Sequence, residues 1–221
     1  MEPQRRLAAI ARMKLTIPPV YPITDKMLAR RSSHFSILRE LVRGGARFVQ
    51  IRDKSTPLQE LLKDLHQCVE FAFKNGVTLI VNDRCDLVLS CGAMGVHLGQ
   101  EDLPPDAARS ILGRTKLIGL SAHSLAQVRK SRHSSIQYIG FGPIYPTSTK
   151  EDALPEVGLR RLTAACRLSS VPVVAIGGIG LDQVREVLQT GACSVAVISA
   201  LMQAKSIARQ MERFLERARA K

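Results

Sequence analysis

Short apolar segments recur at even intervals along the 221-residue chain, and most of them end in polar residues. Eight have the length and β-branched character of buried strands, and they cover residues 20–25, 47–53, 77–83, 95–100, 116–122, 138–145, 172–179 and 194–201. Because near-continuously apolar strands that alternate with helices form parallel sheets, the pattern predicts an α/β fold. Eight such units in about 200 residues are typical of a single (β/α)8 TIM barrel, and an open doubly wound sheet is the alternative.

The clearest helical pattern follows the second predicted strand. Its apolar stripe consists of Leu58, Leu61, Leu62, Leu65, Cys68, Val69 and Ala72. Thr56 and Gln59 have the spacing of a capping box, and Pro57 suits the first helical position. Asn75 and Gly76 supply a C-terminal stop. The sequence therefore predicts a helix that starts at Pro57 under a Thr56 cap.

Composition indicates a reduced globular protein. The five cysteines form no C-x-x-C pair and lie mostly among apolar residues, which predicts free thiols and a cytoplasmic location. No apolar run reaches the roughly 18 residues that a membrane span needs, so we expect no membrane partner. Residues 1–19 are interpreted as an N-terminal extension, and residues 20–221 as the barrel domain.

The charge balance favours anionic partners. The chain has 32 Lys and Arg residues against 19 Asp and Glu residues, a formal net charge of +13. Proteins that bind nucleic acid usually concentrate their basic residues and add aromatic stacking surfaces, whereas here the basic residues are scattered and Trp is absent. We therefore expect small phosphorylated molecules and no nucleic acid. A non-catalytic basic barrel that binds polyanions is an alternative.

The active site of a TIM barrel lies at the C-terminal ends of its strands, where this sequence places polar residues. The second predicted strand ends with Gln50, Arg52 and Lys54 at alternating positions. Alternate residues of a strand point the same way, so an amide and two cations can converge on one anion. A solvated strand edge would give the same pattern.

Carboxylates follow the third and fourth predicted strands. Asn82 and Asp83 end one strand, and Asp102 closely follows the next. With phosphate oxygens and water, Asp83 and Asp102 suffice to hold Mg²⁺. The alternative is that each carboxylate caps the following helix. His97 is interpreted as a residue of the barrel interior, and the fifth predicted strand ends near Ser121.

A second anion site is predicted after strands six to eight. The loop "GPIYPTSTKED" offers donors to a phosphate from Thr147, Ser148, Thr149 and Lys150. The Gly-Gly pair at 177–178 lets backbone amides approach a ligand, and Ser199 starts the segment after the eighth strand. Loops after strands seven and eight are the usual phosphate site of this barrel. A reaction between two phosphorylated molecules, with pyrophosphate leaving, would use both sites.

The stretches "QIRDK", "VNDR", "GVHLGQED", "SAH", "GPIYPTSTK", "AIGGI" and "AVISA" together resemble the thiamine-phosphate synthase family. The resemblance runs in unbroken order from about Tyr21 to Leu201. It implies a (β/α)8 barrel and a Mg²⁺-dependent transferase of thiamine biosynthesis. This enzyme would couple hydroxymethylpyrimidine pyrophosphate to hydroxyethylthiazole phosphate and release pyrophosphate. It also implies a homo-oligomer.

Roles follow from the resemblance residue by residue. The implied ligands of the pyrimidine pyrophosphate are Gln50, Arg52, Lys54, Asn82, Ser121 and Lys150. The implied ligands of the thiazole phosphate are Thr147, Thr149, Gly178, Ile198 and Ser199. Ile51, Asp53 and Ser148 are implied as further substrate-binding residues. The implied ligands of Mg²⁺ are Asp83 and Asp102. The implied catalytic residues are Arg52, Lys54, Ser121 and Lys150. Asp53 stands where the family more often has Glu.

The closest rival function is that of a thiazole tautomerase, a related barrel in which His123 would be the acid and base. Such an isomerase needs neither pyrophosphate nor metal. It would have no chemical reason to assemble the complete set Arg52, Lys54, Asp83, Asp102 and Lys150. The sequence therefore favours the synthase.

Overall fold

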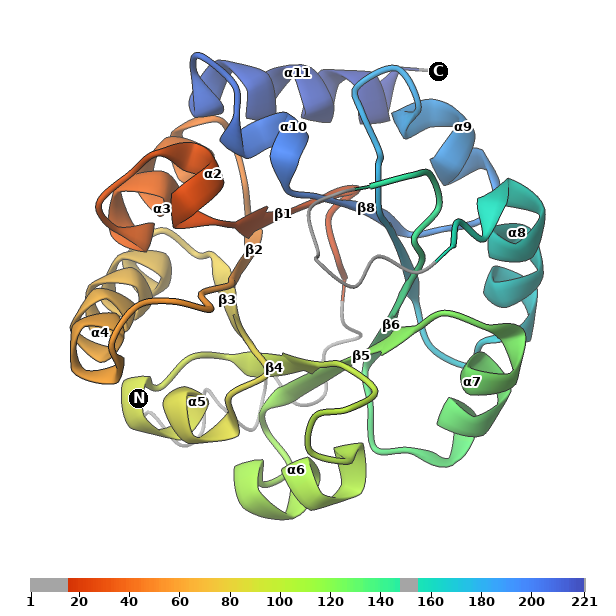
Figure 1. The fold of residues 1–221 in the computed structure, drawn as a ribbon, viewed down its shortest axis with the longest axis horizontal. Helices are drawn as coiled ribbons and strands as arrows, with labels where there is room; N and C mark the ends of the chain where they lie inside the picture. Colours follow the sequence, from red (N-terminus) through yellow and green to blue (C-terminus); the bar gives the residue numbers. More distant parts are fainter. Residues whose placement is uncertain (1–15, 148–154, 221) are drawn as a thin grey trace.

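The computed structural model of the chain describes residues 16–147 and 155–220 (Figure 1). Its eight parallel strands form a closed barrel in chain order. They are β1 (Val20–Thr24), β2 (Phe48–Ile51), β3 (Thr78–Asn82), β4 (Gly95–Leu98), β5 (Leu117–Ala122), β6 (Tyr138–Phe141), β7 (Val173–Ile176) and β8 (Ser194–Val197). Pairing of β1 with β8 closes the ring. The predicted TIM barrel is therefore confirmed, and the open sheet is excluded.

Helices surround the barrel on its outside (Figure 1). They are α2 (Lys26–Ala29), α3 (His34–Arg43), α4 (Leu58–Lys74), α5 (Cys85–Cys91), α6 (Pro105–Leu112), α7 (Leu125–Lys130), the 3₁₀ helix η1 (Ser131–His133), α8 (Gly158–Leu168), α9 (Val184–Gln189), α10 (Ser199–Met202) and α11 (Ile207–Arg219). Among the residues described, none of these helices has the length and apolar character needed to cross a membrane.

The start of α4 differs from the sequence prediction. The helix begins at Leu58 with Pro57 as its N-cap, and no side chain caps it. The Thr56 hydroxyl instead donates to Oδ2 of Asp53 at 2.7 Å. The predicted capping box is therefore wrong, because a carboxylate of the preceding loop takes the hydroxyl. The predicted stop is confirmed in Asn75, the C-cap.

The barrel interior is packed at its base. Its buried apolar residues are Ile17, Tyr21, Ile23, Phe48, Ile80, Tyr138, Val174 and Ala196. The rings of Tyr21, Phe48 and Tyr138 meet edge to face, with centroids 4.7 to 6.0 Å apart. Gly119 leaves room for these rings, because a Cβ there would lie 2.2 Å from Cζ of Tyr138. The filled interior leaves the rim as the place for ligands.

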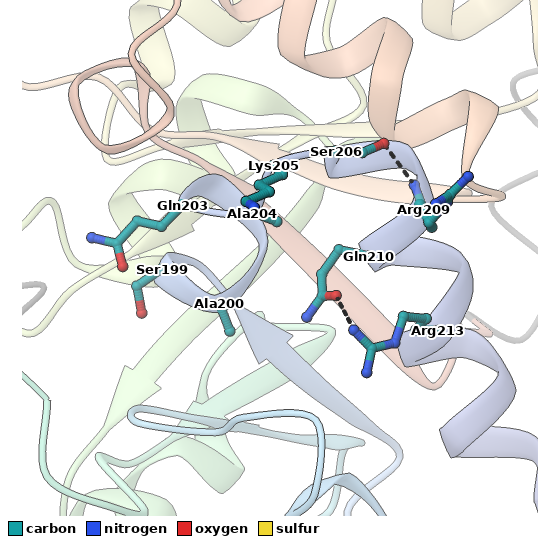
Figure 2. A pocket seen from close by; sticks show the side chains of 9 residues that line it. All are labelled: Ser199, Ala200, Gln203, Ala204, Lys205, Ser206, Arg209, Gln210 and Arg213. Atoms are coloured by element: carbon teal, nitrogen blue, oxygen red, sulfur yellow. Dashed lines mark hydrogen bonds between the residues drawn. The ribbon is translucent and has the colours of Figure 1, made fainter.

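The chain after β8 folds back beside the rim in two helices (Figure 2). α10 starts at Ser199, and α11 begins after a short turn. Oγ of Ser206 accepts a hydrogen bond from the backbone N–H of Arg209 at 3.3 Å and caps α11. The buried residues Met211 and Phe214 anchor α11 in the outer core. Leu201 and Met202 of α10 are buried in the same core, so the helix that begins at Ser199 is also held by packing.

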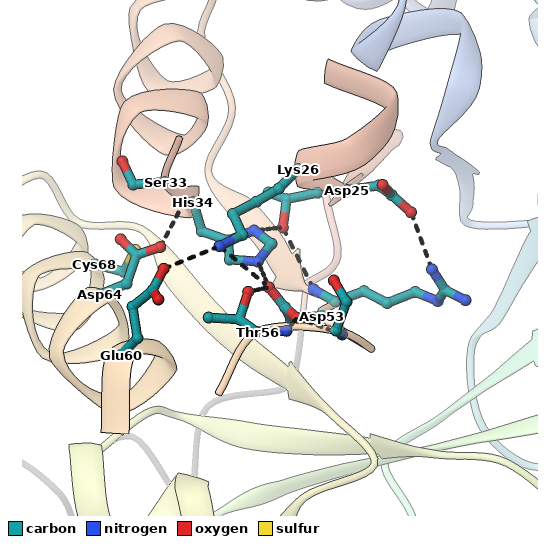
Figure 3. Close-up of polar contacts among 12 residues, drawn as sticks. Asp25, Lys26, Ser33, His34, Asp53, Thr56, Glu60, Asp64 and Cys68 are labelled. Carbon is teal, nitrogen blue, oxygen red and sulfur yellow. Dashed lines mark hydrogen bonds and ion pairs between the residues drawn. The ribbon is translucent and has the colours of Figure 1, made fainter. Parts of the chain in front are cut away.

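A buried polar cluster ties β1 and α3 to the loop after β2 (Figure 3). The ring of His34 is fully buried between two partners, Oγ1 of Thr24 at 2.7 Å from Nδ1 and Oδ2 of Asp53 at 2.8 Å from Nε2. Oδ1 of Asp53 accepts from the backbone N–H groups of Ser55 and Thr56, at 2.9 and 2.7 Å. The cluster therefore holds the loop that carries two predicted anion-binding cations.

The surroundings keep His34 neutral. Burial lowers the pKa of His34, and this outweighs the carboxylates of Asp53 and Asp64, which raise it, while Lys26 lowers it further. A neutral imidazole has one N–H donor, so Nε2 donates to Asp53 and Nδ1 accepts from the Thr24 hydroxyl. The Thr24 hydroxyl oxygen also accepts a hydrogen bond from the backbone N–H of Arg52, the residue that follows β2, at 3.3 Å.

The carboxyl of Asp53 stays ionised in this cluster. Burial acts to raise the pKa of Asp53, but hydrogen bonds from Thr56, Ser55 and His34 outweigh it and the pKa is lowered. Both carboxylate oxygens are therefore occupied by the protein's own donors.

The packing of the interior predicts that Gly119→Ala is destabilising. The new Cβ would overlap Tyr138 and His97, and overpacking a core typically costs about 1–3 kcal/mol. Urea unfolding measures this loss. Gly180→Ala is the matched control, because its Cβ would meet only the end of the Gln183 side chain, which can turn away at the loss of its hydrogen bond to the Gly180 N–H. Equal stability of the Gly119→Ala variant and the parent would contradict the packing described.

The neutral state of His34 predicts that stability falls as pH is lowered from about 7.5 to 5.5. Its folded pKa lies below the unfolded value of about 6.5, so below that pH the unfolded chain takes up a proton that the folded chain does not. Asp53 loses its contribution only at lower pH, below about 4. Thermal unfolding across this range should show a shallower pH dependence in His34→Gln than in the parent. His66→Gln, at an exposed position of α4, should keep the parent's slope, and an unchanged slope in His34→Gln would refute the assignment.

Candidate active site

A cleft of about 370 Å³ opens at the rim beside β2 and β3. Its polar lining residues are Asp53, Lys54, Thr56, Asn82, Asp83, Arg84 and Asp102. Its apolar lining residues are Ile51, Leu58, Leu61, Leu65, Val81 and Leu87. Leu58 is 50% exposed here, so it does not belong to the buried stripe predicted for α4. The cleft joins charged groups to an apolar wall.

The two predicted metal ligands meet in this cleft. Asp83 follows β3 and Asp102 follows β4, and these strands are neighbours in the barrel. Burial raises the pKa of Asp102, and a hydrogen bond with the Asp83 carboxyl raises it further. Neither residue caps a helix, since the N-caps of α5 and α6 are Arg84 and Pro104. The alternative that both are helix caps is therefore wrong.

Asp83 is held in a strained backbone conformation. Its φ of 62° lies in the left-handed region, which non-glycine residues rarely adopt. Its N–H donates to the carbonyl of His97 at 2.8 Å, and Oδ2 lies 2.5 Å from Nζ of Lys54. Strain of this kind is retained where the surroundings enforce it, commonly at functional sites. Here it directs the carboxylate toward Lys54 and Asp102.

This pair of carboxylates fits a hard divalent cation. Burial is the main reason that the pKa of Asp102 is raised, and the neighbouring Asp83 carboxyl adds to it. Two carboxyls in contact repel each other when both are ionised, and a cation between them removes that repulsion. The described residues contain no group of three or more His, Cys, Asp and Glu side chains placed to bind a metal. An ion here would therefore take its other ligands from phosphate or water, as Mg²⁺ commonly does.

The residues at the end of β2 divide between interior and rim. Gln50 is buried and its Nε2 donates to the Tyr21 hydroxyl at 2.8 Å. Nη1 of Arg52 donates to Oδ2 of Asp25 at 3.0 Å, which holds the guanidinium beside β1. The Asp53 side chain is taken up by the His34 cluster, so a substrate contact at this position would fall to its backbone.

Asp25 was missed in the sequence analysis. It ends the first predicted strand, as Asp83 ends the third, so the same rule of polar strand ends identifies it. Its two carboxylate oxygens have separate roles, because Oδ1 caps α2 by accepting from the N–H of Leu28 and Oδ2 holds Arg52.

Ser121 and two histidines lie at the ends of β4 and β5. His97 is buried in the interior, as predicted, and its Nε2 lies 3.0 Å from Oγ of Ser121. The amide of Gln100 donates to the Ser121 carbonyl at 2.5 Å. His123 lies farther along, with Nδ1 donating to the carbonyl of Gly142 at 2.6 Å. That bond ties His123 to the loop after β6.

Ser199 lines a separate cavity of about 430 Å³ between α10 and α11 (Figure 2). Three basic residues line this cavity: Arg209 and Arg213 lie one turn apart along α11, and Lys205 directly precedes the N-cap of that helix. No acidic residue is among the described residues that line it. The cavity therefore presents positive charge next to a predicted phosphate ligand.

The loop after β7 packs directly on the loop after β6. Gly178 has a φ of +65°, and a Cβ there would lie 2.5 Å from the Pro146 carbonyl oxygen and 2.8 Å from Cβ of Tyr145. Only glycine permits this approach, which brings Gly178 beside the loop of Thr147. Ile198 immediately precedes α10. Three predicted ligands, Ser148, Thr149 and Lys150, lie outside the described residues, and their roles stay predictions.

Comparison with known proteins bears on the same segments. The sequence profile of the family described as thiamine monophosphate synthase matches residues 20–201. Thiamine-phosphate synthase of Methanocella arvoryzae is 41% identical over 188 residues, which cover 85% of this chain and 89% of that protein. Thiamine-phosphate synthase of Chloroflexus aurantiacus is 38% identical over 188 residues, covering 85% and 87%.

The fold agrees with a solved structure. Thiamine phosphate pyrophosphorylase from Pyrococcus furiosus superposes with a TM-score of 0.82 at 33% identity, over 91% of this chain and 96% of that one. The profile match spans every barrel strand and both candidate anion sites. The chain therefore belongs to the thiamine monophosphate synthase family of transferases.

Proposed function

We propose that this chain joins hydroxymethylpyrimidine pyrophosphate to hydroxyethylthiazole phosphate, giving thiamine phosphate and pyrophosphate, in the cytoplasm. The observation that carries this proposal is the meeting of Lys54, Asp83 and Asp102 in one cleft at the strand ends. Such a group suits a diphosphate that arrives with a divalent cation. Family membership supports the same reaction.

The cleft beside β2 and β3 is the proposed diphosphate site. Asp83 and Asp102 would hold Mg²⁺, which supplies positive charge to the diphosphate oxygens when bound. Lys54 lies at the cleft and is paired with Asp83, and its side chain is 59% exposed and therefore accessible to a ligand. The guanidinium of Arg52 is held at the ends of β1 and β2 by its hydrogen bond to Asp25. Asn82 lines the cleft, and Lys150 is the further cation predicted from the resemblance.

The proposed reaction needs no nucleophile from the protein. The bond between the pyrimidine methylene carbon and the diphosphate oxygen breaks, and its electron pair leaves with pyrophosphate. The lone pair of the thiazole nitrogen then forms the new carbon–nitrogen bond. Lys54 and Arg52 stabilise the charge that develops on the leaving oxygen. Removing one such preorganised donor typically costs about 3 kcal/mol, roughly a hundredfold in rate.

The thiazole phosphate is assigned to the second site. Thr147, Gly178, Ile198 and Ser199 come from three neighbouring loops, and Ser199 adjoins the cationic cavity of α11. Positive charge there would draw a phosphate to the rim. The two phosphorylated substrates would thus occupy different loops of one rim. A homo-oligomer remains an expectation from the resemblance.

Neither rival function explains the cleft. A tautomerase needs an acid and base but has no use for adjoining carboxylates and Lys54. His123, the base expected for such an enzyme, has Nδ1 engaged by the Gly142 carbonyl. A polyanion-binding barrel has no use for two carboxylates at its rim, since they repel phosphate.

The direct test is incubation of the purified protein with both phosphorylated substrates and Mg²⁺, followed by mass spectrometry. We expect a product with the mass of thiamine phosphate and one equivalent of pyrophosphate. Isomerised thiazole phosphate without coupling would instead establish the tautomerase.

We predict that the coupling activity needs Mg²⁺ and both carboxylates. Asp83→Asn and Asp102→Asn should each lower kcat/KM by about a hundredfold or more, because the amide keeps the size but loses the charge that holds the ion. Steady-state synthesis with and without EDTA, with Mg²⁺ titrated back, measures this. Asp86→Asn is the control in the first turn of α5, three residues after Asp83, where the exposed carboxylate pairs with Arg84. Full activity in EDTA would show that the reaction does not depend on a metal ion.

We also predict that the two substrates can be separated by mutation. Ser199→Ala and Thr147→Val should raise the KM for thiazole phosphate several-fold and leave the KM for the pyrimidine diphosphate unchanged. The reason is that the two anion sites are built by different loops. Kinetics with each substrate varied in turn provide the check, and parallel weakening of both substrates would show that the division is wrong.

A further inference from the structure

Five polar side chains form a continuous hydrogen-bonded chain through the barrel interior. Nε2 of Gln50 lies 2.8 Å from the Tyr21 hydroxyl, which lies 2.9 Å from the Tyr138 hydroxyl. That hydroxyl lies 3.1 Å from Nδ1 of His97, and Nε2 of the same ring lies 3.0 Å from Oγ of Ser121. The chain therefore runs from one predicted substrate ligand to another, through three residues with no predicted ligand role.

The interior keeps the chain protonated and dry. Tyr21, Tyr138 and Gln50 are each no more than 2% exposed, and His97 is 8% exposed. Burial raises the pKa of Tyr21, and burial raises that of Tyr138 as well. Each tyrosine thus carries one O–H proton at working pH, and each buried donor requires an acceptor.

The amide of Gln50 sets the direction of the chain. Its nitrogen can only donate, so the Tyr21 oxygen accepts and the Tyr21 proton goes to the Tyr138 oxygen. The Tyr138 proton then goes to Nδ1 of His97, which must be unprotonated. A neutral imidazole with no proton on Nδ1 carries it on Nε2, where it is donated to Oγ of Ser121.

The opposite direction would leave one buried hydroxyl proton without an acceptor. If Tyr138 donated to Tyr21, the Tyr21 oxygen would accept from both Tyr138 and Gln50. Its own proton would then have no acceptor among the contacts of the described residues. Leaving a buried donor unpaired costs about 1–3 kcal/mol. One direction is therefore favoured over the other.

We propose that Tyr21, Tyr138 and His97 are positioning residues that fix Ser121 as a hydrogen-bond donor toward the barrel mouth. Ser121 accepts from His97, so its own proton is left for a ligand atom with a lone pair. A diphosphate oxygen or an unprotonated ring nitrogen is such an atom. The identity of that ligand rests on the proposed function, whereas the tautomer of His97 does not.

The first test is nitrogen NMR of the full-length protein with ¹⁵N-labelled histidine and no substrate. We expect His97, assigned by loss of its signal in His97→Gln, to be neutral with the proton on Nε2. A proton on Nδ1, or on both nitrogens near pH 7.5, would overturn the proposal. Because no substrate is present, this test can fail while the transferase activity stands, and the reverse also holds.

The second test is a double-mutant cycle on kcat/KM for the pyrimidine diphosphate. Tyr138→Phe should lower this kcat/KM about tenfold, which corresponds to the loss of one hydrogen bond. The same variant should change the His97 tautomer ratio. Once Ser121→Ala has removed the end of the chain, adding Tyr138→Phe should cause little further loss. Phe48→Leu is the packing control, since Phe48 touches the Tyr138 ring without a hydrogen bond, and it should leave the tautomer unchanged. Losses that multiply in the double variant would contradict the proposed coupling.

Discussion

The closure of eight parallel strands is the constraint on which this structure depends. Once β1 pairs with β8, every strand presents its C-terminal end to the same rim. Residues as distant in sequence as Lys54 and Ser199 are thereby brought to one face. The apolar segments that form the strands also fill the base of the barrel, so ligands are confined to the rim.

The rim combines charges that would be unfavourable alone. Asp83 and Asp102 touch, and burial together with this contact raises the pKa of Asp102. Lys54 offsets part of the repulsion through its bond to Asp83. A divalent cation would offset the rest, so that the same carboxylates would change from repelling a diphosphate to anchoring it. The strained backbone of Asp83 and the buried cluster around His34 hold these charges in place.

Much of the barrel and of the rim could be predicted from the sequence, because both depend on local patterns. The strands are marked by apolar runs, and Asp83, Asp102 and Lys54 follow from the rule that chemistry lies at strand ends. Contacts between residues that are far apart in the sequence leave no such local pattern. Tyr21 and Tyr138 bond across 117 positions, and nothing in the two largely apolar segments around them marks the pairing.

Competition between hydrogen-bond partners explains where the sequence predictions failed. Thr56 has capping-box spacing, yet its hydroxyl goes to Asp53, a carboxylate that is itself held by the buried ring of His34. Asp53 was predicted to bind substrate, and that prediction is untested, but its side chain is engaged within the protein. The left-handed backbone of Asp83 is likewise set by its surroundings, since its N–H bonds to β4.

The central claim is that the rim forms a diphosphate site whose two carboxylates act through a divalent cation. Isothermal titration calorimetry of the full-length protein with inorganic pyrophosphate tests it most directly, with Mg²⁺ in one series and EDTA in the other. The account predicts binding with Mg²⁺ and at least tenfold weaker binding in EDTA, because the carboxylates then face the anion uncompensated. Equal affinity in both series would contradict it.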